Sequence, residues 1–152
     1  MSTPPERLQH LPALEAPVAD ETDVYRLIPV ASCDVIDGQW EFQSGAFDNS
    51  TPLRDGERDD EMSVVLQDTL AALDRLPERL PIETPCSGDP ELWGVARLNI
   101  GFLRKDEEQE IIRSPKEDEP AHGDVRGTKN TKRRRRLKKH AEWVIRPSKD
   151  PE

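Results

Sequence analysis

The sequence predicts a small α+β protein with a mixed or antiparallel sheet, one central helix and a C-terminal basic helix. Short segments rich in β-branched and aromatic residues recur between turn signals, and apolar residues take helical spacing in only two places. The length of 152 residues is that of about one domain. Charged residues make up 35% of the chain, above the typical share of about 25%. We therefore expect one modest core, with part of the chain outside it.

Both ends of the chain are expected to lie outside the domain. Residues 1–21 contain four prolines among scattered leucine and alanine residues, a composition that disfavours regular structure and predicts a flexible arm. Residues 22–146 form the predicted single domain, and residues 147–152 are expected to fray.

Three strands are expected in the first half of the domain. Residues 24–29 are rich in β-forming side chains and end at a proline, and residues 40–42 alternate after an Asp-Gly turn signal. Residues 62–66 are predicted to form a buried strand. Between the last two strands, residues 48–60 lack any apolar period and predict a loop.

The central helix is predicted at residues 66–76, where leucines recur at helical spacing until Pro77 closes the helix. A proline-rich connector follows. Residues 93–103 are then the clearest strand candidate, because apolar side chains alternate along them, and residues 110–113 and 122–125 are predicted to form two further short strands.

The C-terminal basic helix is predicted at residues 130–145. Leu137, Ala141 and Val144 fall on one face at helical spacing, so this face is expected to pack across the sheet. Pro147 follows the helix and cannot continue it.

Positive charge is concentrated in the same segment. Residues 1–125 hold 11 basic and 28 acidic residues, whereas residues 126–152 hold 11 basic and 3 acidic residues. A fixed cationic surface attracts phosphates through a salt-dependent, sequence-independent interaction. We therefore predict contact with DNA, RNA or another polyanion. The predicted anion-binding residues are Lys129, Lys132, Arg133, Arg134, Arg135, Arg136, Lys138 and Lys139.

The same charges could instead meet an acidic protein surface, belonging either to this chain or to a partner. An exposed ion pair contributes only roughly 0–1 kcal/mol, so a cluster this dense favours an external partner over self-pairing. Base recognition would need side chains that reach or stack on bases, and Asn130 and Trp143 are the nearby candidates. The leading hypothesis is a non-enzymatic accessory protein that contacts a polyanion.

A small enzyme acting on a nucleotide or RNA phosphate is an alternative from another class. The unperturbed pKa of a histidine, about 6.5, suits proton transfer near neutral pH, so His122 is the candidate acid or base. Asp124 lies two residues further on and could orient it. Arg26 and Ser63 are the other candidate catalytic residues, with Arg26 as a phosphate clamp.

The order of Arg26, Ser44 and Ser63 resembles the arginine-then-serine arrangement of ADP-ribosyltransferase-like folds, which implies that early strands grip a nicotinamide dinucleotide. The wider motif order over about residues 24–146 looks like that of a set of small hypothetical prokaryotic proteins. This second resemblance carries no activity. It singles out Arg26, Ser44, Phe47, Ser63 and His122.

No metal site or cofactor is predicted, because Cys33 and Cys86 stand alone and no cysteine or histidine spacing typical of a metal site occurs. The first residues lack the positive charge and apolar run of a signal peptide, and no apolar stretch approaches the roughly 20 residues of a membrane span. We therefore expect a cytoplasmic protein with reduced thiols and no membrane partner.

Overall fold

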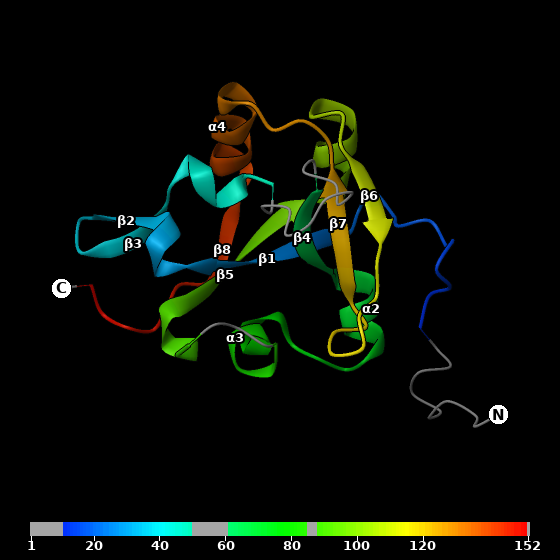
Figure 1. Cartoon of the computed structure of the whole chain (residues 1–152), viewed down its shortest axis with the longest axis horizontal. Coiled ribbons are helices and arrows are strands. Elements are labelled where there is room, and N and C mark those ends of the chain that lie inside the picture. The colour runs from blue at the N-terminus through cyan, green and yellow to red at the C-terminus, as the bar shows by residue number, and fades with distance from the viewer. Residues whose placement is uncertain (1–10, 50–60, 85–87, 152) are drawn as a thin grey trace, which may run out of the picture.

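The fold is built on a six-stranded sheet in which neighbouring strands are antiparallel, with the strand order β6-β7-β4-β1-β5-β8 (Figure 1). The computed structural model describes residues 11–49, 61–84 and 88–151. The strands of this sheet are β1 (Asp23–Pro29), β4 (Glu61–Leu66), β5 (Trp93–Asn99), β6 (Glu110–Arg113), β7 (His122–Arg126) and β8 (Glu142–Ile145). The α+β class and the mostly antiparallel sheet are therefore confirmed.

A separate hairpin is formed by β2 (Cys33–Ile36) and β3 (Gln39–Phe42). Asp37 and Gly38 connect the two strands with φ angles of 51° and 77°. Two successive positive φ angles are what a two-residue hairpin turn with the twist of its strands requires, which explains why the Asp-Gly signal was informative.

The helical elements in the described part of the chain are all short. The α-helices there are α2 (Gln67–Ala72), α3 (Leu80–Glu83) and α4 (Thr131–His140). The 3-10 turns are η1 (Val30–Ser32), η2 (Ser44–Phe47), η3 (Pro77–Arg79) and η4 (Pro90–Leu92), and η5 (Phe102–Asp106) is a π-helical turn.

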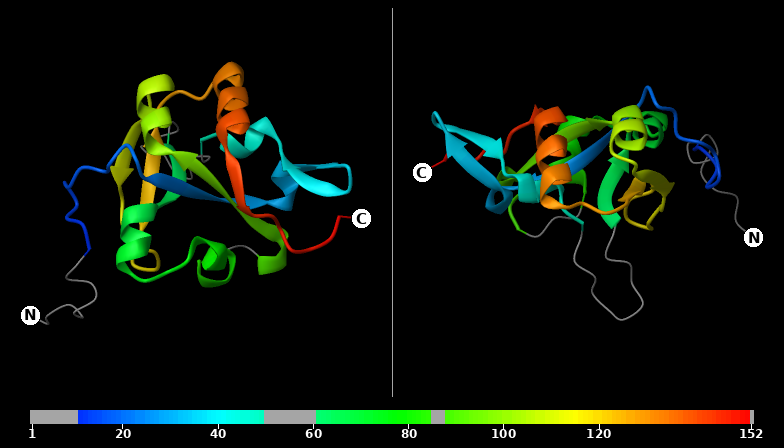
Figure 2. Two further views of the ribbon diagram at one scale, coloured as in Figure 1. Left: turned by 180° about the vertical axis from the view of Figure 1, so that it is seen from behind. Right: turned by 90° about the horizontal axis from the view of Figure 1, so that it is seen from above.

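The two faces of the sheet carry two hydrophobic clusters. Along β1, Val24 and Ile28 belong to the larger cluster, whereas Tyr25 and Leu27 belong to the smaller one, because successive strand residues point to opposite faces. The larger cluster also contains Leu137 of α4. Figures 1 and 2 show α4 and η5 on one side of the central strands, and α2 and α3 on the other.

The expected central helix at residues 66–76 is shorter than predicted, because α2 ends at Ala72. Asp74 takes a φ of 55°, its N–H donates to the Ala71 carbonyl, and the N–H of Arg75 donates to the Leu70 carbonyl. This pattern of bonds around a left-handed residue is a Schellman cap. The backbone therefore stops the helix before Pro77 is reached.

The helix predicted at residues 130–145 is also corrected at its end. Ala141 is extended, and the next four residues form β8, which pairs with the outer edge of β5. The edge of a sheet has unpaired backbone N–H and C=O groups. Hydrogen bonds to this edge replace those that a longer helix would have formed. Leu137 and Val144 consequently pack in different clusters, so they do not share one helical face.

The predicted strand at residues 93–103 ends early, at Asn99. The Asn99 side chain accepts a hydrogen bond from the Phe102 N–H at 3.0 Å, and the chain then enters η5. The apolar alternation of Ala96 and Leu98 continues past Asn99 because Ile100, which lies outside the strand, is buried in the core as well. The apolar pattern beyond Asn99 therefore reflects burial in the core and not a longer strand.

The described parts of the two chain ends contact the domain. Val18 is 4% exposed, and Arg113 donates to the carbonyls of Ala16 and Pro17. At the other end, the Trp40 indole donates to the Lys149 carbonyl at 2.7 Å. Residues 1–10 of the predicted arm, residues 50–60 of the predicted loop and Glu152 lie outside the described residues.

Candidate functional site

Helix α4 is anchored at its start and at its centre. The Asn130 side chain caps the helix by accepting a hydrogen bond from the Arg133 N–H at 2.8 Å. Leu137 is fully buried in the larger cluster. The basic side chains on α4 are therefore held at fixed positions relative to the sheet.

Lys129, directly before the cap, is 4% exposed. Its ammonium group donates to the carbonyls of Val125 and Gly127, each at 2.9 Å, and to the Asn49 side chain. This lysine lies inside the fold, where oxygen acceptors compensate its loss of hydration.

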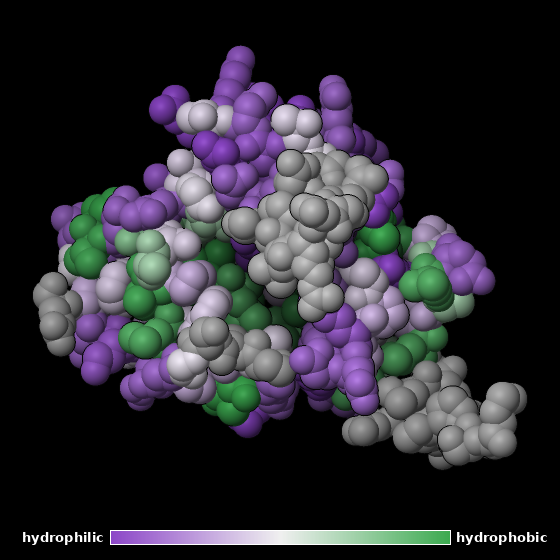
Figure 3. Space-filling view, in the orientation of Figure 1, coloured by the Kyte–Doolittle hydropathy of each residue, from purple (hydrophilic) through white to green (hydrophobic). Residues whose placement is uncertain are grey.

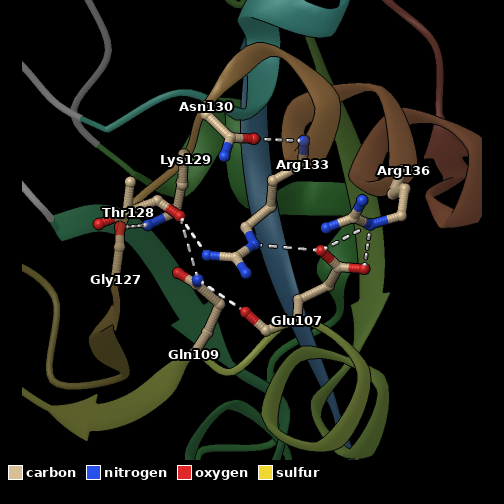
Figure 4. Close-up of polar contacts among 8 residues, drawn as sticks. All are labelled: Glu107, Gln109, Gly127, Thr128, Lys129, Asn130, Arg133 and Arg136. Carbon is tan, nitrogen blue, oxygen red and sulfur yellow. Dashed lines mark hydrogen bonds and ion pairs between the residues drawn. The ribbon is translucent and has the colours of Figure 1, made fainter.

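Glu107 is the acidic residue that faces α4 most directly, and it is 1% exposed. Arg136 donates from Nε to both of its carboxylate oxygens, and the Nε of Arg133 lies 3.3 Å from one of them (Figure 4). Arg133 also donates to the Thr128 carbonyl at 2.8 Å. Two arginines of the basic run are thus used to hold α4 against η5 and the loop after it.

Arg134 is also held within the fold. Its Nη1 lies 3.2 Å from the Asp48 carboxylate and donates to the Lys129 carbonyl at 3.0 Å. Lys129, Arg133, Arg134 and Arg136 therefore all have intramolecular partners.

The other four basic residues form what we call the α4 stripe: Lys132, Arg135, Lys138 and Lys139. Each of these side chains is exposed, and none has an ion-pair partner among residues 11–49, 61–84 and 88–151. Spacings of three and four residues place them on one helical face that spans about 10 Å of the axis. Arg135, Lys138 and Lys139 line an open groove beside Ser44 of η2.

A cavity of about 450 Å³ lies where β1 and β4 separate. These strands pair only at Val24 with Leu66 and at Tyr25 with Val65, so they diverge beyond these pairs. In Figure 3 a hollow with hydrophobic residues at its floor lies near the centre of the molecule, close to β1 as Figure 1 places it.

Arg26 lies in the gap between the two strands and lines the cavity. Its guanidinium donates to the carbonyls of Ala46 and Ser63, each at 2.7 Å, and to that of Asp48 at 3.3 Å. Burial lowers the pKa of Arg26 to about 10, and the negative charge of Asp48 opposes that shift. Arg26 thus bridges strands that have no ladder bonds to each other at this point.

His122 lines the same cavity from β7. Its Nδ1 lies 3.0 Å from the Ser114 carbonyl and 2.9 Å from the Ser114 hydroxyl, which itself donates to Asp124 at 2.7 Å. Because that hydroxyl proton is committed to Asp124, Nδ1 of His122 is the donor to Ser114. The neutral imidazole therefore carries its lone pair on Nε2.

Nε2 of His122 is buried and has no hydrogen-bond partner within the described part of the chain. Burial lowers the pKa of His122, Lys116 lowers it further, and Asp124 and Glu119 act in the opposite direction. The lowered pKa favours the neutral imidazole, which keeps an unused lone pair on Nε2.

The three candidate catalytic residues, Arg26, Ser63 and His122, line this one cavity. The separate sequence candidates Ser44 and Phe47 do not: Ser44 lies at the groove beside α4, and Phe47 is buried in the core. Sequence reasoning did not find the further lining residues. They include Tyr25, Leu27, Val65, Thr84, Trp93, Lys116 and Glu119.

Among the described residues, no group of three or more His, Cys, Asp or Glu side chains could hold a metal ion. Cys33 is a free, buried thiol whose pKa burial raises to about 11, and Cys86 lies outside the described residues. No helix in the described part of the chain is long and apolar enough to cross a membrane.

Comparison with known proteins finds no matching family model, no matching curated protein and no matching solved structure.

Proposed function

We propose that the protein binds nucleic acid through the α4 stripe. The observation that carries this proposal is the division of the basic run into two sets. Lys129, Arg133, Arg134 and Arg136 have partners inside the fold, whereas the four stripe residues are exposed on one face without a carboxylate. Four like charges held this closely repel one another, and a polyanion relieves that repulsion.

Counterion release favours a nucleic acid over an acidic protein surface as the partner of the α4 stripe. The protein has a net charge of -9, and its own acidic side chains already pair with basic residues outside the stripe, such as Arg133 and Arg134. Ion pairs exposed at a protein surface contribute little, about 0–1 kcal/mol each. A nucleic acid adds counterion release to each phosphate contact, so the same four cations contribute more to its binding.

The proposed binding does not distinguish sequences. Asn130 uses its side-chain oxygen to cap α4, and Trp143 stacks on Phe42 with ring centroids 4.0 Å apart. The Nε1 of Trp143 is buried. Both candidate base-reading side chains are therefore engaged in the fold, and backbone contact without base readout is expected.

The test is fluorescence anisotropy with mixed-sequence single-stranded RNA and DNA of about 20 nucleotides at about 50 mM salt. Arg135→Gln combined with Lys139→Gln is expected to weaken binding about tenfold or more, because two phosphate contacts are lost. The matched control is Arg133→Gln with Arg136→Gln, which removes the same charge from side chains that contact Glu107. The control should keep most of the affinity.

Two results would contradict the proposal: no binding to either probe at low salt, or equal losses from the two double variants. Sedimentation at low and high salt tests the alternative in which the stripe binds an acidic protein surface, because it measures self-association. Salt-sensitive self-association that Lys139→Gln abolishes, without any binding of RNA or DNA, would favour a protein partner instead.

A further inference from the structure

The cavity between β1 and β4 has the size and the mixed lining of a small-molecule site. Its volume of about 450 Å³ falls within the roughly 300–1,000 Å³ of ligand pockets. Tyr25, Leu27, Val65 and Trp93 supply apolar and aromatic surface. Polar groups from three strands, β1, β4 and β7, meet at the same cavity.

Arg26 gives the cavity a cation that has no carboxylate on it. Three of its five N–H groups donate to backbone carbonyls, and within the described ranges it forms no ion pair. Carbonyl oxygens carry only partial negative charge, so they satisfy the hydrogen bonds of a guanidinium without neutralising it. A charge removed from water in this way is stabilised strongly by an anion.

The other charged groups that the structure describes at the cavity form no ion pair with this cation. Glu119 is buried, but both of its oxygens accept hydrogen bonds from Arg75, at 2.8 and 2.9 Å, so its charge is already matched. Lys116 and Asp118 are exposed at the rim with opposite charges. Burial and Lys116 both favour the neutral form of His122. The charge of Asp48 also acts on Arg26, but its carboxylate is paired with Arg134 at 3.2 Å. Among the described residues, Arg26 is therefore a cation beside the apolar wall without a carboxylate in ion-pair contact.

We propose that this cavity binds a small organic anion, a carboxylate or a phosphate ester on an apolar or aromatic body, with the anionic group against Arg26. The body of the ligand lies on Leu27, Val65 and Trp93, and His122 forms part of the cavity wall. None of the α4 stripe residues lines this cavity, so the site is independent of nucleic-acid binding.

The ligand class is tested by calorimetric titration of the full chain with three matched probes: benzoate, phenyl phosphate and uncharged benzyl alcohol. At least one of the two anions should bind about tenfold or more tightly than benzyl alcohol. The preferred anion distinguishes a carboxylate from a phosphate ligand. Methyl resonances of Leu27 and Val65 should shift on titration, because the aromatic ring lies against them.

Gly45 offers a variant that closes the cavity without disturbing the fold. It lines the cavity, and a Cβ at this position would meet no atom within 4 Å. Gly45→Phe is expected to weaken anion binding about tenfold or more, and the control Gly45→Ala to change it less than about twofold. Arg26→Gln is avoided, because that substitution would also remove bonds that join β1 to η2 and β4.

Three outcomes would overturn the proposal: no binding of either anion up to about 10 mM, binding of benzyl alcohol as tight as that of both anions, or binding without shifts at Leu27 and Val65. Arg135→Gln with Lys139→Gln separates the two sites. That variant should lose RNA binding and keep the anion affinity, so failure of one proposal leaves the other standing.

Discussion

The Nε of Arg136 donates to both oxygens of the Glu107 carboxylate, at 2.8 and 3.0 Å. Arg133 contacts the same carboxylate at 3.3 Å. One buried acidic residue next to η5 is thus shared by two arginines of α4. This arrangement pairs half of the central Arg-Arg-Arg-Arg block with a carboxylate of the fold.

Glu107→Gln is expected to lower the free energy of unfolding by about 1–3 kcal/mol, because it leaves two arginines facing a buried neutral amide. Urea unfolding measures this loss. The control is Glu108→Gln, which makes the same change in charge at the next, exposed position and should alter stability by less than about 0.5 kcal/mol. Equal effects at the two positions would show that the Glu107 contacts contribute little.

The salt dependence of nucleic-acid binding should correspond to four phosphate contacts, one for each cation of the α4 stripe. The logarithm of the binding constant for single-stranded RNA is expected to fall with the logarithm of salt with a slope of about -3, since each phosphate contact contributes about -0.7. Arg135→Gln should reduce that slope by about 0.7, and Arg133→Gln should leave it unchanged. A slope near about -6 would mean that all eight basic residues contact phosphates, contrary to the proposal.

His122 should make the protein less stable in mild acid. Its pKa is lowered in the folded state from 6.5, so the unfolded chain binds the proton more readily, and stability falls as the pH drops below about 6.5. The loss continues until the pH passes the folded pKa. Urea unfolding of the wild-type chain between about pH 7.5 and 5 should show this decline, and His122→Gln should show less of it.

The same pH dependence should persist in His140→Gln, whose imidazole stacks on Phe102 at 3.8 Å and does not line the cavity. If wild type and His122→Gln lose stability in parallel as the pH falls, His122 is not the group responsible.

Gly94 is expected to tolerate no side chain. A Cβ there would lie 2.6 Å from Trp143, 2.7 Å from Pro147 and 2.8 Å from the Ile145 carbonyl. Gly94→Ala should therefore displace β8 from β5 and cost about 1–3 kcal/mol. Urea unfolding measures the loss, and faster hydrogen exchange at β8 amides localises it. Gly45→Ala, in open space, is the matched substitution and should change stability by less than about 1 kcal/mol.

The parts of the fold that local patterning determines could be predicted. The strands near 24–29, 62–66 and 110–113 follow from β-rich or apolar runs with clear ends. β8 could not be predicted, because residues 142–145 are extended only through pairing with an edge that lies more than 40 positions away in sequence. α2 was overestimated because its cap depends on Asp74 taking a left-handed conformation, which its sequence does not specify.

The candidate sites were predictable to a similar degree. Arg26 and His122 stood out by residue type, yet the cavity that joins them arises from the limited pairing of β1 with β4, a long-range property. The burial of Lys129 likewise could not be predicted from the sequence. A lysine at the edge of a basic run looks like its neighbours until the carbonyls of Val125 and Gly127 close around it.

Helix α4 connects β7, the second strand of the sheet order, to β8, the last. Its cations therefore exist as a stripe only while both flanking strands are in place, and a peptide of residues 129–140 would not reproduce their arrangement. By thermodynamic linkage, an anion that binds the stripe must stabilise the whole sheet. A change that separates β8 from β5 must in turn lower the affinity for the anion. Anion binding to the stripe and folding of the sheet are thus two linked equilibria, and each shifts the other.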